Sequence, residues 1–468
     1  MKPLLTLVTG VITAHAFTTS QPYPTYQGSQ PPYSAIQPSL ASIHAAKATT
    51  APSSPTSHVK GKAFDRIVQI WLENIDFPDA ASNPNFQWLA ERAITLTNYF
   101  AVTHPSQPNY AAAVAGEYFG MDHDDFVSFP SNIFTVADLL DTRNISWGEY
   151  QEHIPYPGFQ GMNYSNQLTG ADDYVRKHNP LVLFERVSAD EERGRRVKGF
   201  DEFWEDVRGR RLPQWVFVTP NMTNNAHDTD VGVAGRWTRE FLKRLLGNEY
   251  FMEGTLVVVT FDESGGEDVH NRVYTLLLGG AIPGSLWGTT DDGFYTHYST
   301  ISTVSVNWDL PSLGRWDCNA NVLPPLLFHG ANRYQNAKDF ETEKMFYNLS
   351  YPGPMSQTKY TKDWWPRPNT IARCASGMGV LEEVKQMWGN MGEGSYDYTR
   401  AYPDDGLYGH GDVHGKGHGY AWTDGTGKKD PKEVPEVSPP AVVSGAALTS
   451  FRSLWYLGYV AVAAVLFL

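Results

Sequence analysis

The chain has 468 residues, of which 41% are hydrophobic and 13% aromatic, so it can bury one large core or several average ones. It carries 37 Lys and Arg against 51 Asp and Glu, a net charge of −14. No basic patch dominates, and we therefore exclude nucleic acid as the expected partner.

The first residues have the pattern of a secretory signal peptide. Residues 1–16 start with a basic Lys2, continue with a short apolar stretch and end in Ala14-His15-Ala16. The alternative is a buried N-terminal helix. Residues 17–62 are rich in Pro, Ser, Thr, Gln and Ala and lack periodicity, which predicts a flexible lead.

From Phe64 onward, predicted strands alternate with predicted helices. The strands are expected at 65–72, 94–102, 145–150, 213–219, 255–261 and 272–279, and the helices at 84–92, 111–116, 135–142 and 237–246. This alternation predicts an α/β fold: a single large domain, placed at 63–350, with a mainly parallel central sheet flanked by helices.

The apolar, β-branched run from Thr255 to Phe261 is typical of a strand that is buried on both faces. It ends in two adjacent acids, Asp262 and Glu263. Ligands of open α/β sheets bind just outside the carboxyl ends of the strands. The two acids are therefore either part of a site or a pair of loop charges.

Other predicted strands also end in side chains that can bind ligands, namely Glu73, Asn74, His104, Ser106, Asn221, His227 and Asp228. Several carboxylates are costly to bury together unless a cation neutralises them, and oxygen and nitrogen donors suit a divalent metal. A hydroxyl beside such a metal becomes a nucleophile more easily. This combination predicts transfer of a phosphoryl or sulfuryl group.

Each of these residues also has a purely structural interpretation. Ser106 could serve only as a helix N-cap, with Pro108 in the first turn. Glu73 and Asn74 could be ordinary loop residues, and His227 and His297 surface histidines. The convergence of such groups on strand ends favours a site.

Several motifs follow one another in order: Trp71–Asn74, Thr103–Tyr110, Tyr174–Pro180, Pro213–Met222, Ala226–Asp230, Thr260–Glu263, Asn271–Leu278 and Tyr295–Ser299. In this order they resemble the fungal secreted acid phosphatases of the phosphoesterase family. That family includes bacterial acid phosphatases and phosphatidylcholine-type phospholipases C, and is related to alkaline phosphatases. The resemblance spans roughly residues 64–330.

The resemblance implies an alkaline phosphatase-like fold and hydrolysis of phosphate monoesters through a phosphoserine. It implies a divalent metal of unknown identity, held by Glu73, Asn74, Ser106, Asp262 and Glu263. Some relatives have a second aspartate where this chain has the longer Glu263, which can bind a metal differently.

The other implied roles concern the substrate. Ser106 is the expected nucleophile, and the residues expected to contact the phosphate or the leaving group are His104, Asn221, His227, Asp228 and His297. His227 or His297 is the expected proton donor. Two alternatives stay open: a phospholipase C-type phosphodiesterase at the cell surface, and a non-catalytic surface module.

The last part of the chain gives weaker patterns. Residues 351–403 are expected to wrap on the core, and Cys318 and Cys374 either pair or stay free. Residues 404–443 form a Gly/His-rich stretch that is either a linker or, through three histidines, a metal site: His410, His414 and His418.

Residues 444–468 are typical of a glycosylphosphatidylinositol attachment signal; the alternative is a marginal membrane tail. The expected localisation is therefore extracellular, with an anchor to the membrane or wall. N-glycans are expected at Asn144, Asn163 and Asn348. Asn221 also lies in a sequon, but a glycan there would block the predicted site, so we expect it to be unmodified.

Overall fold

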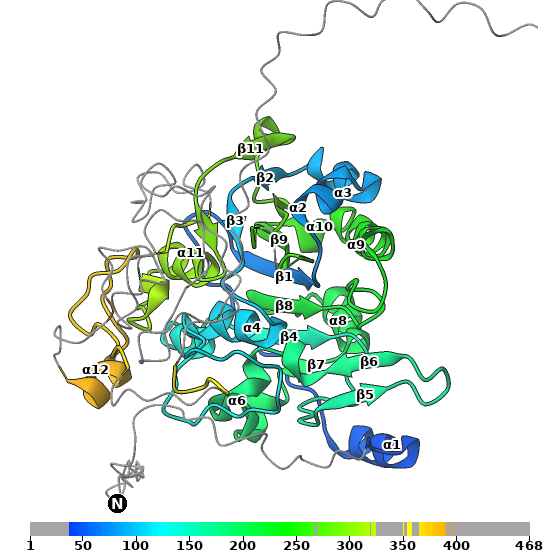
Figure 1. Cartoon of the computed structure of the whole chain (residues 1–468), viewed down its shortest axis with the longest axis horizontal. Coiled ribbons are helices and arrows are strands. Elements are labelled where there is room, and N and C mark those ends of the chain that lie inside the picture. Colours follow the sequence, from blue (N-terminus) through cyan, green and yellow to red (C-terminus); the bar gives the residue numbers. More distant parts are fainter. Residues whose placement is uncertain are drawn as a thin grey trace, which may run out of the picture. The chain divides into compact units, whose positions relative to one another are not determined.

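The computed structural model describes residues 37–266, 270–318, 320–323, 350, 353–357, 365–389 and 396 (Figure 1). The predicted signal peptide, Gly/His-rich stretch and anchor signal lie outside the described residues, as do His410, His414, His418 and Asn348. Within the described part of the chain, no helix is both long and apolar enough to cross a membrane.

A mixed sheet forms the centre of the fold. Over the described residues it has eight strands, in the order β11 (Thr289–Asp291), β2 (Ile94–Leu96), β10 (Thr275–Leu278), β9 (Thr255–Phe261), β1 (Arg66–Leu72), β8 (Trp215–Thr219), β4 (Trp147–Gln151) and β7 (Val197–Lys198). Neighbouring strands are parallel except at β10, which is antiparallel to both β9 and β2. The prediction of a mainly parallel α/β sheet is confirmed.

Two small sheets accompany the large one. One pairs β3 (Tyr99–Phe100) with β12 (Tyr295–Thr296), and the other pairs β5 (Asn163–Ser165) with β6 (Asp172–Val175). The sequence predicts a single strand at 94–102, but the structure divides it into β2 and β3. The chain leaves the large sheet after Leu96, and β3 then pairs with β12 instead.

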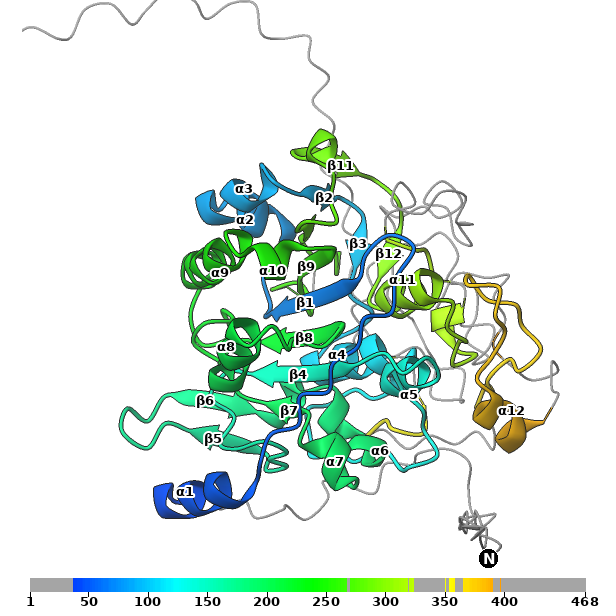
Figure 2. The ribbon, with the colours of Figure 1, turned by 180° about the vertical axis from the view of Figure 1, so that it is seen from behind.

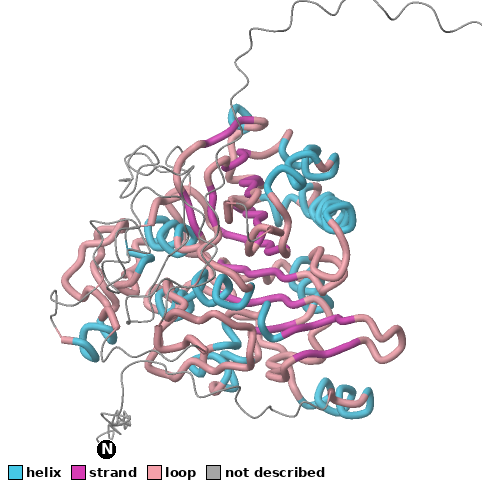
Figure 3. The backbone as a smooth tube through the Cα atoms, in the orientation of Figure 1, coloured by secondary structure: helices cyan, strands magenta, loops and turns pink. Residues whose placement is uncertain are grey.

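Helices lie on both sides of the strands (Figure 3). Their bounds are α1 (Leu40–Thr49), α2 (Phe77–Ser82), α3 (Pro84–Ala90), α4 (Ser106–Ala115), α5 (Val136–Asp141), α6 (Glu185–Ser188), α7 (Glu191–Gly194), α8 (Phe200–Arg208), α9 (Val231–Leu246), α10 (Glu249–Met252), α11 (Ser299–Trp308) and α12 (Glu382–Trp388). The 3₁₀ helices are η1 (Arg176–His178), η2 (Leu181–Leu183), η3 (Gly284–Leu286) and η4 (Trp316–Cys318). Helix α9 packs against α2, α3 and α10, whereas α4 packs against α5 and α11.

The central strands β1 and β9 set the position of the site. Every residue of β9 is buried, as expected for a β-branched strand covered on both faces. The two strands are parallel and in register, with Leu72 opposite Phe261. Both strands therefore end at the same level, and their next residues, Glu73 and Asp262, leave the sheet side by side.

Helix α4 begins at Ser106, five residues before the predicted start at Ala111. The N-cap is Pro105, so Ser106 is the first helical residue and not the N-cap. Polar residues and Pro108 hid this first turn from the sequence pattern, although proline is well tolerated there. The consequence is that Ser106 is fixed on a helix.

Residues 40–62 differ from the predicted flexible lead. The first half forms α1, an alanine-rich helix capped by the side chain of Ser39, which accepts a hydrogen bond from the backbone N–H of Ser42. The second half passes β7, β4 and β8 on its way to β1 (Figure 2). There the Ser57 hydroxyl and the Val59 N–H both donate to the Gln214 side chain, at 2.6 and 2.8 Å.

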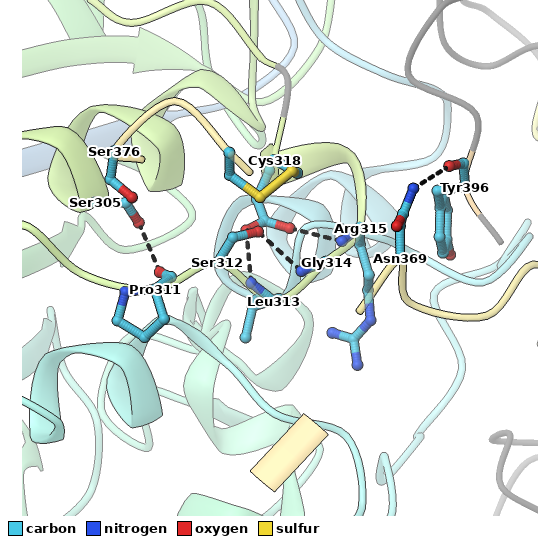
Figure 4. Close-up of a disulfide and its surroundings, with 12 residues drawn as sticks. Ser305, Pro311, Ser312, Leu313, Gly314, Arg315, Cys318, Asn369, Ser376 and Tyr396 are labelled. Atoms are coloured by element: carbon cyan, nitrogen blue, oxygen red, sulfur yellow. Dashed lines mark hydrogen bonds between the residues drawn. A yellow bond between two sulfur atoms is a disulfide. The ribbon is translucent and has the colours of Figure 1, made fainter. Parts of the chain in front are cut away.

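The two cysteines form a disulfide, so the prediction that they pair is confirmed and the alternative of free thiols is wrong. Cys318 at the end of η4 and Cys374 form a disulfide (Figure 4). Beside it, the carboxylate of Asp317 accepts hydrogen bonds from the Ser312 hydroxyl and from the Leu313 and Arg315 N–H groups. The disulfide thus joins the end of the main core to the segment that follows it.

Candidate active site

Three carboxylates converge at the carboxyl ends of β1 and β9. Glu73 and Asp262 have no exposed surface, and Glu263 is 2% exposed. The first residue of α4 reaches them: the Ser106 hydroxyl lies 3.1 Å from Glu73 Oε2 and 3.4 Å from Glu263 Oε1. The structure therefore brings together Ser106, Glu73, Asp262 and Glu263, as the sequence predicts.

Glu73 is held by donors on two sides. The Tyr110 hydroxyl donates to its Oε1 at 3.0 Å, and Nε2 of His178 lies 2.8 Å from the same oxygen. Burial alone would raise the pKa of Glu73, but the interaction with His178 and its hydrogen bond lower the pKa to about 2, while burial lowers the pKa of His178 in turn. The contact with His178 therefore favours the ionised form of Glu73.

Glu263 is fixed by the other polar residues of the predicted set. Asn74 Nδ2 donates to its Oε1 at 2.6 Å, and His104 Nδ1 lies 3.0 Å from Oε2. Asn109, one turn into α4, also donates to Oε2, at 3.2 Å. Burial raises the pKa of Glu263, and the neighbouring His104 opposes that rise. His104 and Asn74 thus lie in the site, in contact with Glu263.

Asp262 is the carboxylate whose charge has the fewest hydrogen-bond partners. Its Oδ1 accepts the Glu263 N–H at 2.8 Å, while its buried Oδ2 has no hydrogen-bond partner. Burial and the charges of Glu73 and Glu263 raise its pKa well above the usual range. A buried acceptor beside two further carboxylates is costly unless a cation or a proton neutralises it.

The donor set fits a divalent cation by its chemistry. Carboxylate, amide and hydroxyl oxygens from Glu73, Asn74, Ser106, Asp262 and Glu263 are ligands of the kind that such ions take. No group of three His, Cys, Asp or Glu side chains is already arranged as a formed metal site anywhere in the described chain. The fit therefore rests on the donor types and on the unpaired Asp262 Oδ2.

His297 does not fit its predicted role of proton donor. It is fully buried, and burial lowers its pKa to about 3, so it is neutral even in acid. Its Nε2 donates to the backbone carbonyl of Asp262 at 2.6 Å, and its Nδ1 accepts from the Tyr99 hydroxyl at 3.3 Å. With both ring nitrogens hydrogen-bonded within the protein, His297 supports the backbone of Asp262.

His227 and Asp228 lie at the rim, on the loop after β8. Their side chains are 34% and 37% exposed, and His227 Nδ1 lies 2.8 Å from Asp228 Oδ1. The ring of His227 faces His178, with 5.9 Å between the ring centroids. An exposed histidine oriented by a carboxylate can exchange protons with water, which suits a general acid.

Asn221 contacts a different group of residues. Its Nδ2 lies 3.0 Å from His153 Nδ1, and its Oδ1 accepts the Asn224 N–H at 2.8 Å. Its own N–H donates to Glu152 at 2.9 Å. These contacts fix the loop after β8 and give Asn221 a positioning role, without contact to the three carboxylates.

The sequence analysis missed His178, Tyr110 and Asn109, which all contact the carboxylates. His178 lies within the motif Tyr174–Pro180, in η1 after β6, and this motif was the available signal. It also borders a small pocket at the same sheet edge, lined by Gln151, Glu152, Asp173, Tyr174, Val175, His178, Thr219, Pro220 and Met222.

Known proteins resemble the chain over most of its length. The model of the phosphoesterase family matches residues 79–311. An acid phosphatase of Aspergillus fumigatus is 53% identical over 371 residues, which cover 79% of this chain and 82% of that protein. A phosphate-repressible acid phosphatase of Penicillium chrysogenum is 52% identical over 368 residues, covering 79% of this chain and 88% of that protein.

One solved structure gives a more distant likeness. A protein in the alkaline phosphatase superfamily from Vibrio parahaemolyticus is 14% identical, covers 54% of this chain and 67% of that one, and has a TM-score of 0.35. That value is too low to bear on the fold, which the sheet itself establishes. The sequence relatives are decisive: the chain belongs to the phosphoesterase family and is a hydrolase that acts on phosphoric esters.

Proposed function

We propose that the protein is an acid phosphatase that hydrolyses phosphate monoesters through a phosphoserine on Ser106. The observation that carries the proposal is the position of Ser106, whose hydroxyl lies within 3.1 and 3.4 Å of two buried carboxylates at the start of α4. The relatives named acid phosphatases support the substrate class.

The proposed reaction consists of two displacements at phosphorus, in which different residues take part. In the first, the Ser106 Oγ–P bond forms as the hydroxyl loses its proton to solvent, the ester P–O bond breaks, and His227 protonates the leaving alcohol. In the second, water attacks phosphorus and gives a proton to His227, the P–Oγ bond breaks, and Ser106 Oγ takes up a proton from solvent. The N-terminal end of α4 favours the negative charge of the phosphoryl group.

Glu73, Asn74, Asp262, Glu263 and Ser106 are the residues that would hold a divalent cation. When bound, it would offset the charge of the carboxylates and of the phosphoryl oxygens, and it would make the Ser106 hydroxyl easier to deprotonate. Tyr110, His178 and His104 orient Glu73 and Glu263 for this task.

The test is Ser106→Ala in the full chain. We expect turnover of p-nitrophenyl phosphate to fall by roughly 10⁴-fold or more while the melting temperature stays unchanged. Ser131→Ala, at an exposed serine, is the matched control and should keep full activity. Substantial hydrolysis by Ser106→Ala would remove Ser106 as the nucleophile.

A second assay separates monoesterase from phospholipase C activity. We expect the wild-type protein to release phosphate from p-nitrophenyl phosphate and to leave phosphatidylcholine vesicles intact. Preferential cleavage of phosphatidylcholine would instead favour the phosphodiesterase alternative.

We also propose that the protein works outside the cell, held by a glycosylphosphatidylinositol anchor. The N- and C-terminal sequence patterns support this, and a disulfide is typical of secreted proteins. Release of the activity from intact cells by a phosphatidylinositol-specific phospholipase C is the expected result. Activity that stays with cytosolic extract would contradict it.

A further inference from the structure

Lys177 forms a largely buried ion pair at the edge of the proposed site. Its Nζ lies 2.8 Å from Asp124 Oδ2, and its side chain is only 16% exposed. Lysine is seldom buried to this extent without a function or a fixed partner, because its ammonium group is strongly hydrated in water. The proposed two-step reaction assigns it no role.

Two short chains of contacts place this ion pair beside the reacting groups. On one side, Lys177 immediately precedes His178, whose Nε2 lies 2.8 Å from Glu73 Oε1. On the other side, Asp124 Oδ1 accepts the backbone N–H of Gln107 at 2.9 Å. Gln107 directly follows Ser106, so the pair spans from the flank of Glu73 to the start of α4.

The charge of Lys177 acts within the carboxylate cluster. Burial opposes its ionisation, but Glu73, Asp124 and Asp262 outweigh that effect and raise the pKa of Lys177. The same interaction helps to lower the pKa of Glu73. Lys177 is therefore a permanent cation near Ser106, where the negative charge of a phosphoryl group must be accommodated.

We propose that Lys177 binds the non-bridging oxygens of the substrate's phosphate group, and that Asp124 is the counter-ion that its ammonium group contacts when no phosphate is bound. The proposal rests on the proposed phosphatase function. An ammonium group has three N–H donors, and Asp124 accepts from one of them, which leaves donors for a phosphate. A lysine serves such a site as a point charge.

The competing explanation is that the ion pair only clamps the loop of Asp124 onto η1. The two explanations differ in how the partners respond to substitution. A clamp is lost equally when either partner is neutralised. A phosphate-binding lysine is lost only when Lys177 is changed, whereas Asp124→Asn removes a competing negative charge and keeps an oxygen for the Gln107 N–H.

The experiment measures the dissociation constant of inorganic phosphate by calorimetry, and KM and kcat for p-nitrophenyl phosphate, in the full chain. For Lys177→Met we expect phosphate binding to weaken by about 10-fold or more and KM to rise accordingly. For Asp124→Asn we expect phosphate binding to stay equal or become tighter. Lys177→Arg should retain most of the affinity, because it retains the charge.

Equal weakening by Lys177→Met and Asp124→Asn would overturn the proposal in favour of the clamp, and so would unchanged phosphate binding in Lys177→Met. If Lys177→Met does not fold, weaker phosphate binding by Asp124→Asn still overturns it. The proposed function fails separately, through a wild-type protein that does not hydrolyse the monoester.

Discussion

Two buried groups of charges lie on the same sheet and differ in how they are compensated. At the ends of β1 and β9, the direct hydrogen-bond partners of Asp262 and its two acidic neighbours are histidines and neutral donors, and Asp262 Oδ2 has no partner. The nearest ammonium group described, that of Lys177, is paired with Asp124. Beside β7, Lys198 and Asp206 are equally buried, 1% and 2% exposed, but they pair with each other at 2.8 Å.

The second group is also complete in its hydrogen bonds. The hydroxyls of Ser54 and Tyr150 donate to Asp206 Oδ2 at 2.8 and 2.9 Å, and Lys198 donates to Ser54 at 2.6 Å. A buried pair of this kind serves the fold, because every charge has its partner within the chain. An excess of one sign, by contrast, indicates that something outside the chain completes the group.

The largest expected effect tests the uncompensated group. Asp262→Asn should lower kcat/KM for p-nitrophenyl phosphate by roughly 10³-fold or more, since it removes a proposed ligand and half of the charge pair after β9. In chelator-treated protein it should raise the melting temperature, because the buried repulsion decreases. Added divalent ions should stabilise the wild-type protein and not the variant.

Asp292→Asn, at an exposed acid, is the matched control and should change neither property. If Asp262→Asn destabilises the chelated protein as strongly as it impairs catalysis, the acidic cluster is structural, and the contrast with Lys198 and Asp206 is lost.

The compensated group should respond in the opposite way. Asp206→Asn leaves Lys198 buried without a counter-charge and should reduce the free energy of unfolding by about 3–5 kcal/mol, with kcat/KM of the folded protein unchanged. Urea unfolding monitored by tryptophan fluorescence measures the loss. The double variant Lys198→Met/Asp206→Leu should recover much of it.

The exposed pair Lys62–Asp309, 2.5 Å apart with side chains 49% and 41% exposed, is the control. Lys62→Met should have no measurable effect on unfolding, because surface ion pairs contribute little. A loss there equal to that of Asp206→Asn would contradict the importance of burial.

Glu149 on β4 is intermediate between the acidic cluster and the Lys198–Asp206 pair. It is a single buried acid that forms no ion pair within the described residues. Its Oε1 accepts the Leu181 N–H at 3.1 Å, its Oε2 has no partner, and burial raises its pKa well above the usual range. The folded protein therefore holds this proton at a pH where the unfolded chain has released it. Stability from this group is complete below about pH 4 and declines as pH rises.

Glu149→Gln removes that decline. We expect the variant to be more stable than the wild type by roughly 1–3 kcal/mol at pH 7, and the difference to shrink toward pH 4. Urea unfolding at several pH values measures it. Glu205→Gln, at an exposed position on α8, should show no such trend, and a pH-independent difference for Glu149→Gln would contradict the proposed cause.

The sequence predicted the two acids at the end of β9 but not the residues that hold the acidic cluster in place. Asp262 and Glu263 stood out because an apolar, β-branched run, Thr255–Phe261, precedes them, and the α/β alternation indicated a mainly parallel sheet. His178 could not be placed, because η1 reaches Glu73 only through tertiary packing. His297 was assigned the role of proton donor, but it is buried with both ring nitrogens hydrogen-bonded, which a sequence motif does not report.

The smallest expected effect concerns the loop after β8. It distinguishes a residue that lies near the site from one that takes part in the chemistry. Asn221 lies near the site, yet it is only 7% exposed and its carboxamide is bonded to His153 and Asn224, like the fully satisfied groups beside β7. Its sequon should therefore carry no glycan in the secreted protein, whereas the exposed Asn144 should carry one. Glycopeptide mass spectrometry measures the glycan occupancy of the two sequons.

A glycan on Asn221 would require this loop to open before or during secretion. The polar network around Asn221 would then belong to a mobile rim and not to the rigid support of the site.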